Sequence, residues 1–321
     1  MQMKIIITGS AGFIGMHISQ ELLDLGHEVW GLDNFNDYYQ PELKQNRIQA
    51  IKKNKLFKSI EIDINDIEKL NLENQNFDIC INLAAQAGVR LPISSIDKYV
   101  SSNITGFKAV INFCKKNNIK NLVYASSSSV YSGNNKVPFS ENDALLNPTS
   151  FYAYTKIYNE HLAKSAELDF GLKSFGLRFF TVYGEWGRPD MAYFNFLRKI
   201  LCKEEITIFN DGELFRDMTY ISDIAIGVKK LVDKIEANEI STSEILNLGN
   251  DKPISVLRLV NKLETLTKKK ALIKSIEKND EIKKTHADIS KAKKMIEYNP
   301  SVEFDEGIVR FYYWFKKHYG L

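Results

Sequence analysis

Short apolar runs alternate with helical stretches along the first 180 residues, and this alternation constrains the fold more than any other feature. The runs are nearly continuous in apolar residues, which indicates strands buried on both faces. Amphipathic stretches such as 14–25, 41–53 and 96–116 separate them and predict helices. Strands that alternate with helices form a parallel sheet covered on both sides. The sequence therefore predicts an α/β fold with a doubly wound parallel sheet of the Rossmann type, whose strands are 4–8, 28–33, 56–63, 77–85, 121–127 and 173–179.

The alternation loosens after about residue 180. A turn-rich stretch at 183–189 interrupts it, shorter elements follow, and the next clear helix is predicted at 304–318. We expect residues 1–180 to form the Rossmann domain and residues 181–321 to form mainly a smaller lobe that closes over the strand ends. Because no repeat, low-complexity tract or linker separates the two regions, we expect them to be interleaved.

The composition argues against several classes of function. A net charge of +3 over 321 residues is too small to indicate a nucleic-acid partner. The three cysteines, Cys80, Cys114 and Cys202, are widely spaced and the five histidines show no ligand spacing, so we expect no disulfide framework and no metal site. The N-terminal apolar run is too short for a signal peptide, and no window approaches the ~20 apolar residues of a membrane span. We expect a protein of the reducing cytoplasm without a membrane partner.

A glycine-rich loop, Thr8-Gly9-Ser10-Ala11-Gly12-Phe13-Ile14-Gly15, joins the first predicted strand to the first predicted helix. Its three glycines permit a tight turn, close approach of the backbone to a pyrophosphate, and close packing of helix on strand. The helix N-terminus adds free N–H groups and a partial positive charge. A purely structural turn could use the same glycines, and the GxxGxxG spacing differs from the more usual GxGxxG. The place of the loop between strand and helix favours dinucleotide binding.

Acidic residues end the second and third predicted strands. Asp33 lies 18 residues after Gly15, where a carboxylate is expected to bind the adenosine ribose hydroxyls. Since a carboxylate repels a 2′-phosphate, Asp33, with Asn34 beside it, favours NAD over NADP. Asp63 and Ile64 are candidates for contact with the adenine edge. Each aspartate has a structural alternative, Asp33 as a cap or turn former and Asp63 as a cap at the strand end.

Tyr152 and Lys156 form a YxxxK pair in a predicted helix, where residues four apart share one face. An isolated tyrosine has a pKa near ~10, and a neighbouring ammonium lowers that pKa and favours the phenolate. Lys156 can also reach the nicotinamide ribose, so one residue would orient the cofactor and tune the base. The same spacing recurs twice in the helix predicted at 304–318, where an amphipathic surface helix is the better explanation.

A serine run distinguishes Tyr152 from those two pairs. The fifth predicted strand leads into Ser126-Ser127-Ser128-Ser129-Val130-Tyr131, and Ser127 lies 25 residues before Tyr152. A hydroxyl at a strand end and a tyrosine on a helix can bracket one substrate oxygen at the carboxyl edge of the sheet. A polar loop is the alternative explanation of the run. Together the two features predict proton transfer by Tyr152.

These residues together resemble the extended short-chain dehydrogenase/reductase superfamily, over nearly the whole chain. The likeness is greatest to the nucleotide-sugar 4-epimerases, and among them to the UDP-glucuronate 4-epimerases. Four stretches carry it: LAAQAGVR at 83–90, the serine run with Val130-Tyr131, LRFFTVYG at 177–184, and WGRPDMA at 186–192.

The resemblance implies a role for each candidate residue. Tyr152 would be the base, Lys156 its partner, and Ser127 the hydroxyl that relays the proton at the sugar 4-position. Arg216 would grip the UDP diphosphate, and Thr181 stands where many 4-epimerases have an asparagine. The implied NAD-binding residues are Gly9, Gly12, Phe13, Ile14, Gly15, Asp33, Asn34, Asp63, Ile64, Leu83, Ala84, Ala85 and Lys156. The implied UDP-sugar-binding residues are Arg90, Ser127, Ser128, Ser129, Tyr152, Thr181, Arg188 and Arg216.

The resemblance also implies a homodimer, paired through two long helices at about 95–116 and 152–168. Two positions depart from the family pattern. Glu185 stands where proline is expected, and Asn279-Asp280-Glu281-Ile282 replaces a Pro-Gly-Asp-Val type of stretch near the nucleotide ribose. Neither departure removes a chemical group that the reaction needs.

The implied reaction oxidises the sugar at carbon 4 and reduces it again from the other face, so NAD ends unchanged. With UDP-glucuronate the keto intermediate is a β-keto acid, which readily loses carbon dioxide. Hydroxyls of the serine run and of Thr181, with the charge of Arg188, are expected to hold its carboxylate away from the geometry for that loss.

Four alternatives remain. A 4,6-dehydratase needs an acid after Ser127, where this chain has Ser128 and Ser129. A UDP-glucuronate decarboxylase shares most of the site. A 4-epimerase of UDP-glucose or of a UDP-N-acetylhexosamine, or its uronate, is the nearest competitor. A non-catalytic nucleotide-sensing protein could lose the tyrosine, lysine or serine, and all three are present.

Overall fold

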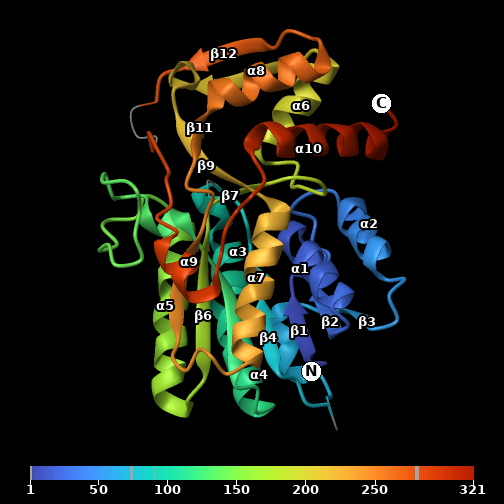
Figure 1. The fold of residues 1–321 in the computed structure, drawn as a ribbon, viewed down its shortest axis with the longest axis vertical. Helices are drawn as coiled ribbons and strands as arrows, with labels where there is room; N and C mark the ends of the chain where they lie inside the picture. The colour runs from blue at the N-terminus through green and yellow to red at the C-terminus, as the bar shows by residue number, and fades with distance from the viewer. Residues whose placement is uncertain (1, 73–74, 90, 279–281) are drawn as a thin grey trace.

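Seven parallel strands form the central sheet of the computed structural model, which describes residues 2–72, 75–89, 91–278 and 282–321 (Figure 1). Their order is β10-β6-β5-β4-β1-β2-β3, and each neighbouring pair is parallel. The order reverses between β1 and β4, which is where ligands bind in doubly wound sheets. The predicted fold class is confirmed. The strands are β1 (Lys4–Thr8), β2 (Glu28–Asp33), β3 (Phe57–Glu61), β4 (Ile79–Asn82), β5 (Asn121–Ser127), β6 (Lys173–Phe179) and β10 (Glu244–Leu248).

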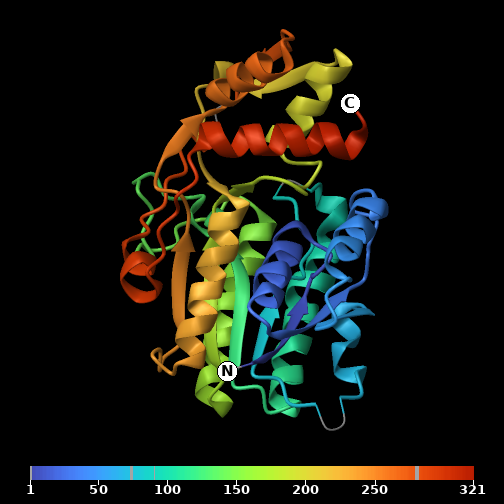
Figure 2. The same ribbon diagram turned by 45° about the vertical axis from the view of Figure 1, so that its right-hand side comes forward.

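Helices cover both faces of this sheet (Figure 2). On one face α1 packs against α2 and α7, and on the other α4 packs against α5. A separate cluster of buried apolar side chains fills each interface, with Ile5 and Ile7 of β1 in one and Ile6 in the other. Because neighbouring side chains of a strand face opposite sides, both faces demand apolar residues. The helices are α1 (Phe13–Asp24), α2 (Pro41–Ile51), α4 (Gly106–Lys116), α5 (Phe151–Phe170) and α7 (Ile221–Glu236).

The prediction of one continuous helix at 96–116 is wrong, because the helix is interrupted. It consists of α3 (Ile96–Tyr99), a π-helical turn η3 (Val100–Thr105) and α4. The turn carries Asn103, whose buried side-chain amide accepts a hydrogen bond from the backbone N–H of Gln86 at 2.8 Å and donates to Thr155 Oγ1 at 3.1 Å. The interruption thus serves contacts with segments distant in the sequence, which the periodicity of 96–116 does not reveal.

A smaller lobe stands beyond the carboxyl ends of the strands, at the top of Figure 1. It holds a three-stranded sheet in the order β11-β9-β7 and a parallel pair of β12 and β8. Aromatic rings fill much of its core, among them Phe194, Phe311 and Phe315. The elements are β7 (Thr181–Tyr183), α6 (Ala192–Cys202), β8 (Glu205–Phe209), β9 (Phe215–Tyr220), β11 (Pro253–Ser255), α8 (Val256–Thr267), β12 (Leu272–Ile276) and α10 (Phe304–Tyr319).

Elements from beyond residue 180 return to the sheet layer. β10 pairs with β6 at one edge of the main sheet, α7 packs against α1, and α9 (Ser290–Ile296) packs against β10 and α7 (Figure 1). The chain therefore passes from the sheet into the lobe and back more than once. A division into two domains at residue 180 stays a prediction.

Membrane spans, metal ligands and cysteines were considered in the sequence, and the described residues bear on each. No helix among them is both long and apolar enough to span a bilayer. They contain no group of three side chains placed to hold a metal ion. Cys80 and Cys114 are buried free thiols, and Cys202 is an exposed one.

Candidate active site

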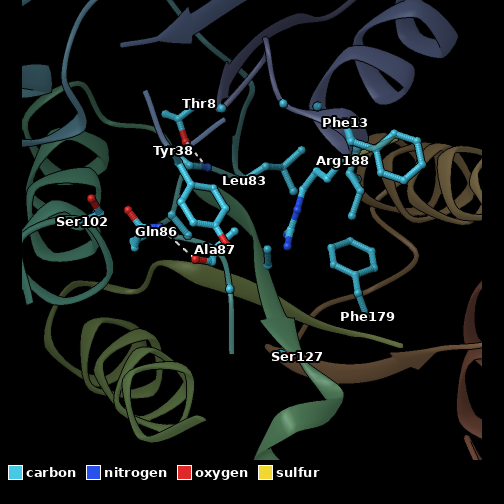
Figure 3. Close-up of a pocket in the computed structure, with 18 of the residues that line it drawn as sticks. Thr8, Phe13, Tyr38, Leu83, Gln86, Ala87, Ser102, Ser127, Phe179 and Arg188 are labelled. Carbon is cyan, nitrogen blue, oxygen red and sulfur yellow. Dashed lines mark hydrogen bonds between the residues drawn. The ribbon is translucent and has the colours of Figure 1, made fainter. Parts of the chain in front are cut away.

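A cavity lies at the carboxyl ends of the strands, where the sheet meets the smaller lobe (Figure 3). Thr8, Asp33, Ser127 and Phe179 line it, and each is the last residue of its strand. The structure thus brings the glycine loop and the Tyr152/Lys156 pair to one cavity. The predicted site residues that line it are Gly9, Gly12, Phe13, Ile14, Gly15, Asp33, Asn34, Ile64, Leu83, Ala84, Ala85, Ser127, Ser128, Ser129, Tyr152, Lys156, Thr181 and Arg188.

Three predicted site residues are not among those that line the cavity. Asp63 caps the 3-10 turn η1 (Ile64–Lys69), accepting from the N–H of Asn65 at 2.9 Å and from Asn34 Nδ2 at 2.7 Å. Arg216 lies on β9 and donates from Nη1 to the carbonyl oxygens of Phe215 and Ile282 at 2.9 and 2.8 Å. Arg90 lies outside the described residues, as do 279–281 of the departing stretch. The structure therefore places Asp63 as a cap, the alternative that the sequence left open.

Close packing explains two glycines of the loop. Gly9 has a φ of +73°, and a Cβ atom there would lie 2.6 Å from the backbone N of Ala84. A Cβ atom on Gly15 would lie 2.1 Å from the carbonyl oxygen of Gly9. Only glycine leaves room for this fold of the loop, which presents backbone N–H groups at the start of α1. The cradle fits a phosphate group.

Asp33 fixes the same loop from the next strand. Its carboxylate accepts hydrogen bonds from the N–H of Ala11 at 3.0 Å and of Phe35 at 2.9 Å. Burial raises the pKa of Asp33, and these hydrogen bonds and the ammonium of Lys44 oppose the rise. Asp33 thus combines the turn-forming role and a position on the cavity wall.

Arg47 of α2 is a residue that sequence reasoning missed. Its guanidinium is fully buried and uses all five N–H donors. Nε and Nη2 donate to the carbonyl oxygen of Trp186 at 2.9 and 2.6 Å, and Nη2 also to that of Gly187 at 3.1 Å. Nη1 donates to the carbonyl oxygen of Ala11 at 3.0 Å and to Tyr39 Oη at 2.6 Å. Arg47 therefore joins the glycine loop to the turn that carries Arg188.

Tyr152 and Lys156 lie on the first turns of α5, which Ser150 caps by accepting from the N–H of Ala153 at 3.2 Å. Lys156 is 2% exposed and donates to the carbonyl oxygen of Ala125 on β5 at 2.8 Å. Its Nζ lies 5.7 Å from the ring centre of Tyr152. The helix thus holds both side chains at the end of β5, next to Ser127.

The charge that acts on Tyr152 is not the one expected. Burial raises the pKa of Tyr152, and the guanidinium of Arg188 and a hydrogen bond with Ser127 lower it. Burial also lowers the pKa of Lys156 to about 8, against the charge of Glu160. The sequence pointed to Lys156 as the group that favours the phenolate, whereas in the structure Arg188 has that effect.

Hydroxyl groups and the guanidinium of Arg188 also line the cavity beside Tyr152. Ser127 Oγ donates to Ser129 Oγ at 3.1 Å and accepts from the N–H of Ser129 at 3.1 Å. Arg188 extends into the cavity near Tyr38 (Figure 3) and pairs with Asp190 at 2.6 Å. Tyr38 Oη donates to the same carboxylate at 3.2 Å, so the loop after β2 and the turn after β7 meet over the cavity. Tyr38 was not predicted from the sequence either.

Comparison with known proteins gives a consistent result. The model of the NAD dependent epimerase/dehydratase family matches residues 5–249. UDP-glucuronate 4-epimerase 3 of Arabidopsis thaliana is 43% identical over 333 residues, which cover 99% of this chain and 77% of the relative. The crystal structure of a UDP-glucuronic acid 4-epimerase from Bacillus cereus, in complex with UDP-glucuronic acid and NAD, is 35% identical with a TM-score of 0.91 and covers 99% of this chain and 100% of that chain.

A UDP-N-acetylglucosamine 4-epimerase from Methanobrevibacter ruminantium, in complex with UDP-N-acetylmuramic acid, is similar in structure as well. It is 28% identical with a TM-score of 0.85, over 99% of both chains. Fold, cavity and sequence matches over most of the length agree, and this chain belongs to the NAD dependent epimerase/dehydratase family.

Proposed function

We propose that this chain inverts carbon 4 of a UDP-sugar with NAD as the resident cofactor, and that its substrate pair is UDP-glucuronate and UDP-galacturonate. One observation supports this most: Tyr152, Lys156 and Ser127 meet at one end of the cavity whose other wall is the glycine loop. The similarity to UDP-glucuronate 4-epimerases supports the choice of substrate.

The cofactor would lie along the switch point of the sheet. The cradle formed by Gly9, Gly12 and Gly15, with Phe13 and Ile14, fits a pyrophosphate, and Asp33 with Asn34 fits the adenosine ribose. Ile64 would lie near the adenine. Asp63 would act on the adenine side indirectly, through its hydrogen bond with Asn34. On the nicotinamide side we assign Lys156 and the segment Leu83, Ala84 and Ala85. NAD held there would supply the acceptor and donor of a hydride at carbon 4 of the sugar.

Tyr152 would remove the proton from the sugar 4-hydroxyl and give it back after the ring has turned. The guanidinium of Arg188 favours the phenolate, so the base works although burial raises the pKa of Tyr152. Ser127 donates a hydrogen bond to the same oxygen and relays the proton. Lys156 holds the cofactor ribose and keeps its charge near the base.

The remaining cavity side chains would hold the rest of the substrate. We assign the carboxylate of the uronate to the hydroxyls of Ser128, Ser129 and Thr181, with Arg188 nearby. These contacts would keep the carboxylate out of the orientation in which a β-keto acid loses carbon dioxide. Arg216, which lies outside the set of residues lining the cavity, would bind the UDP part. Arg90, which is outside the described residues, is assigned to the same part by the sequence alone.

We further propose a cytoplasmic homodimer. Helices α4 and α5 lie side by side on one face of the sheet, and α5 exposes Tyr154, Tyr158 and Leu168. Apolar side chains on paired helices are suited to burial against a second copy. Residues 1–180 would hold NAD and residues 181–321 mainly the UDP-sugar.

Incubation of the purified protein with UDP-glucuronate, followed by chromatographic separation of the products, tests the proposal. We expect UDP-galacturonate, with NAD recovered unreduced from the protein after turnover. The second candidate, a 4-epimerase of UDP-N-acetylglucosamine or UDP-glucose, has support from the Methanobrevibacter ruminantium structure. Parallel incubations with those sugars distinguish the two.

Other products of the incubation would indicate other activities. A UDP-pentose product would indicate a decarboxylase, and a 4-keto-6-deoxy product from a neutral sugar would indicate a dehydratase. No turnover of any UDP-sugar by protein that retains NAD would refute the proposal and favour a sensor.

A further inference from the structure

A buried ion cluster lies directly behind the catalytic pair. Glu160 of α5 accepts from Arg178 Nε at 2.9 Å and from Arg178 Nη2 at 2.7 Å, a bidentate pair in which both side chains are under 10% exposed. Ser126 Oγ donates to Glu160 Oε1 at 2.6 Å. One carboxylate on α5 therefore bonds to β5 and to β6 at once.

The cluster and the catalytic pair share the same helix and the same strand. Glu160 follows Lys156 by four residues, so the two lie on one face of α5. Lys156 donates to the carbonyl oxygen of Ala125, and Glu160 accepts from the next residue, Ser126, which precedes Ser127. Any shift of Glu160 along the strand would move Tyr152 relative to Ser127.

Charge gives Glu160 a second effect. Lys156 is almost fully buried, and burial of an ammonium without an anion is costly. Burial lowers the pKa of Lys156 to about 8, and the charge of Glu160 is the influence that raises it. The other titratable groups that act on the cluster or on Tyr152 are neutral or positive: Tyr99 on α3, Tyr124 on β5, Tyr131 on η4 (Ser128–Tyr131), Arg178 on β6, Tyr152 on α5 and Arg188 on the turn. The acidic groups of these elements lie elsewhere, since Asp97 of α3 is exposed and Glu167 and Asp169 of α5 pair with Lys164 and Lys115. The lysines of α4 are exposed.

The cluster also continues to β10 at the edge of the main sheet. Arg178 Nη1 donates to Tyr131 Oη at 2.6 Å, and Tyr131 Oη donates to Asn247 Oδ1 on β10 at 2.8 Å. Asn247 Nδ2 donates to the carbonyl oxygen of Phe139 at 2.9 Å. Arg178 is therefore held from both sides, and it cannot leave Glu160 without breaking this chain of bonds.

We propose that Glu160 is a positioning residue of the reaction, which supplies the negative charge that keeps Lys156 protonated and ties α5 to β5 so that Tyr152 stays opposite Ser127. This inference rests on the proposed function for its kinetic part. Its electrostatic part concerns the protein alone and is tested without substrate.

The substrate-free test is a double-mutant cycle in unfolding free energy. Wild type, Glu160→Gln, Lys156→Met and the double variant are unfolded by urea at pH 7 and at pH 9.5, without NAD. We expect a favourable coupling between the two positions at pH 7 that shrinks at pH 9.5, where Lys156 has lost its proton. No coupling at pH 7, or a coupling independent of pH, would overturn the proposal whether or not the protein turns over UDP-sugars.

The kinetic test is the pH profile of kcat/KM with the UDP-sugar that the protein accepts. In Glu160→Gln the basic limb should move to lower pH, and a shift of one unit lowers the rate on that limb about tenfold. Glu167→Gln is the matched control, since Glu167 lies on the same helix and pairs with exposed Lys164. An equal loss of rate at every pH, with the limb unmoved, would mean that Glu160 has only a structural role.

Removal of Glu160 leaves Arg178 unpaired, so the single variant can fail to fold. Two further variants separate the charge of Glu160 from its bridge to β6. Arg178→Met breaks the bridge between α5 and β6 but leaves the charge of Glu160 beside Lys156, whereas Glu160→Gln/Arg178→Met breaks the bridge and removes the charge. The basic limb should move to lower pH only in the second, and the same limb in both would overturn the proposal.

Discussion

Arg47 donates two hydrogen bonds to the carbonyl oxygen of Trp186, at 2.9 and 2.6 Å, although 139 residues separate them. The same guanidinium reaches the carbonyl oxygen of Ala11 in the glycine loop. Trp186 has a φ of +61°, a conformation that L-residues adopt at a cost, so the turn needs external support. The geometry of the cofactor loop and of the turn that carries Arg188 is therefore set by one side chain.

Substitution of Arg47 should weaken cofactor and substrate binding together. Lysine keeps the charge but cannot make five bonds in a planar fork, so Arg47→Lys should behave almost as Arg47→Met does. We expect loss of NAD during gel filtration and a decrease in kcat/KM of about 100-fold, since small displacements of positioning groups have effects of that size. Arg198→Lys, on an exposed ion pair with Glu204, is the control. Full NAD content in Arg47→Lys would contradict the prediction.

Removal of the Tyr152 hydroxyl should stop chemistry and spare binding. Tyr152→Phe removes the proton-transfer group, whose loss costs on the order of 10²–10⁴-fold in rate. The ring still packs against Tyr99, with centres 6.0 Å apart, so the fold should be unchanged. Calorimetric titration with UDP-glucuronate should give an affinity near that of wild type. Tyr312→Phe, from one of the two pairs with the same spacing, should keep full activity; a loss there would mean that α10 has a part in the site.

Much of the fold was predictable because it depends on local pattern. β1, β2, β5 and β6 have the predicted bounds, since a strand buried on both faces needs an unbroken apolar run. The break in the helix at 96–116 was not predictable, because Asn103 owes its place to bonds with Gln86 and Thr155. Such partners are set by tertiary structure and leave no periodic signal.

The site divides in the same way. The glycine loop and the Tyr152/Lys156 pair were predictable from their residue types and their places next to predicted strands and helices, and both line the cavity. Arg47 lies in a polar amphipathic helix, where a buried arginine looks like any surface cation. Arg188 was singled out for its charge, but its effect on the pKa of Tyr152 depends on tertiary structure, which brings the two side chains to one cavity.

Loss of the Thr181 hydroxyl should change the products more than the rate. Thr181 begins β7 on the wall of the cavity, where we assign the substrate carboxylate. Without its hydroxyl the carboxylate of the keto intermediate turns more freely, and Thr181→Ala should release more of the decarboxylated UDP-pentose, measured by chromatography after incubation with UDP-glucuronate. Thr265→Ala, at an exposed position on α8, serves as control. An unchanged product ratio would remove Thr181 from this role.

His17 should make the cofactor-free protein less stable in acid. It lies on α1, where Nδ1 is 2.9 Å from the carbonyl oxygen of Phe13, and burial together with the charge of Arg47 lowers the pKa of His17 to about 4. Between pH 6.5 and about 4 the unfolded chain binds a proton that the folded chain does not, so the free energy of unfolding falls as the pH falls through this window. The slope from one such group is at most ~1.4 kcal/mol per pH unit.

His17→Gln should flatten this part of the stability curve, as measured by urea unfolding at intervals between pH 4.5 and 7.5. His161→Gln, exposed on α5, should leave the curve as it is. Arg47→Met removes a positive charge that opposes protonation of His17, so the fall in stability should be smaller and should end at a higher pH. If the difference curve between wild type and His17→Gln is level across the window, the buried state of His17 does not govern acid stability. The predicted effect of Arg47→Met on that stability would then be wrong as well.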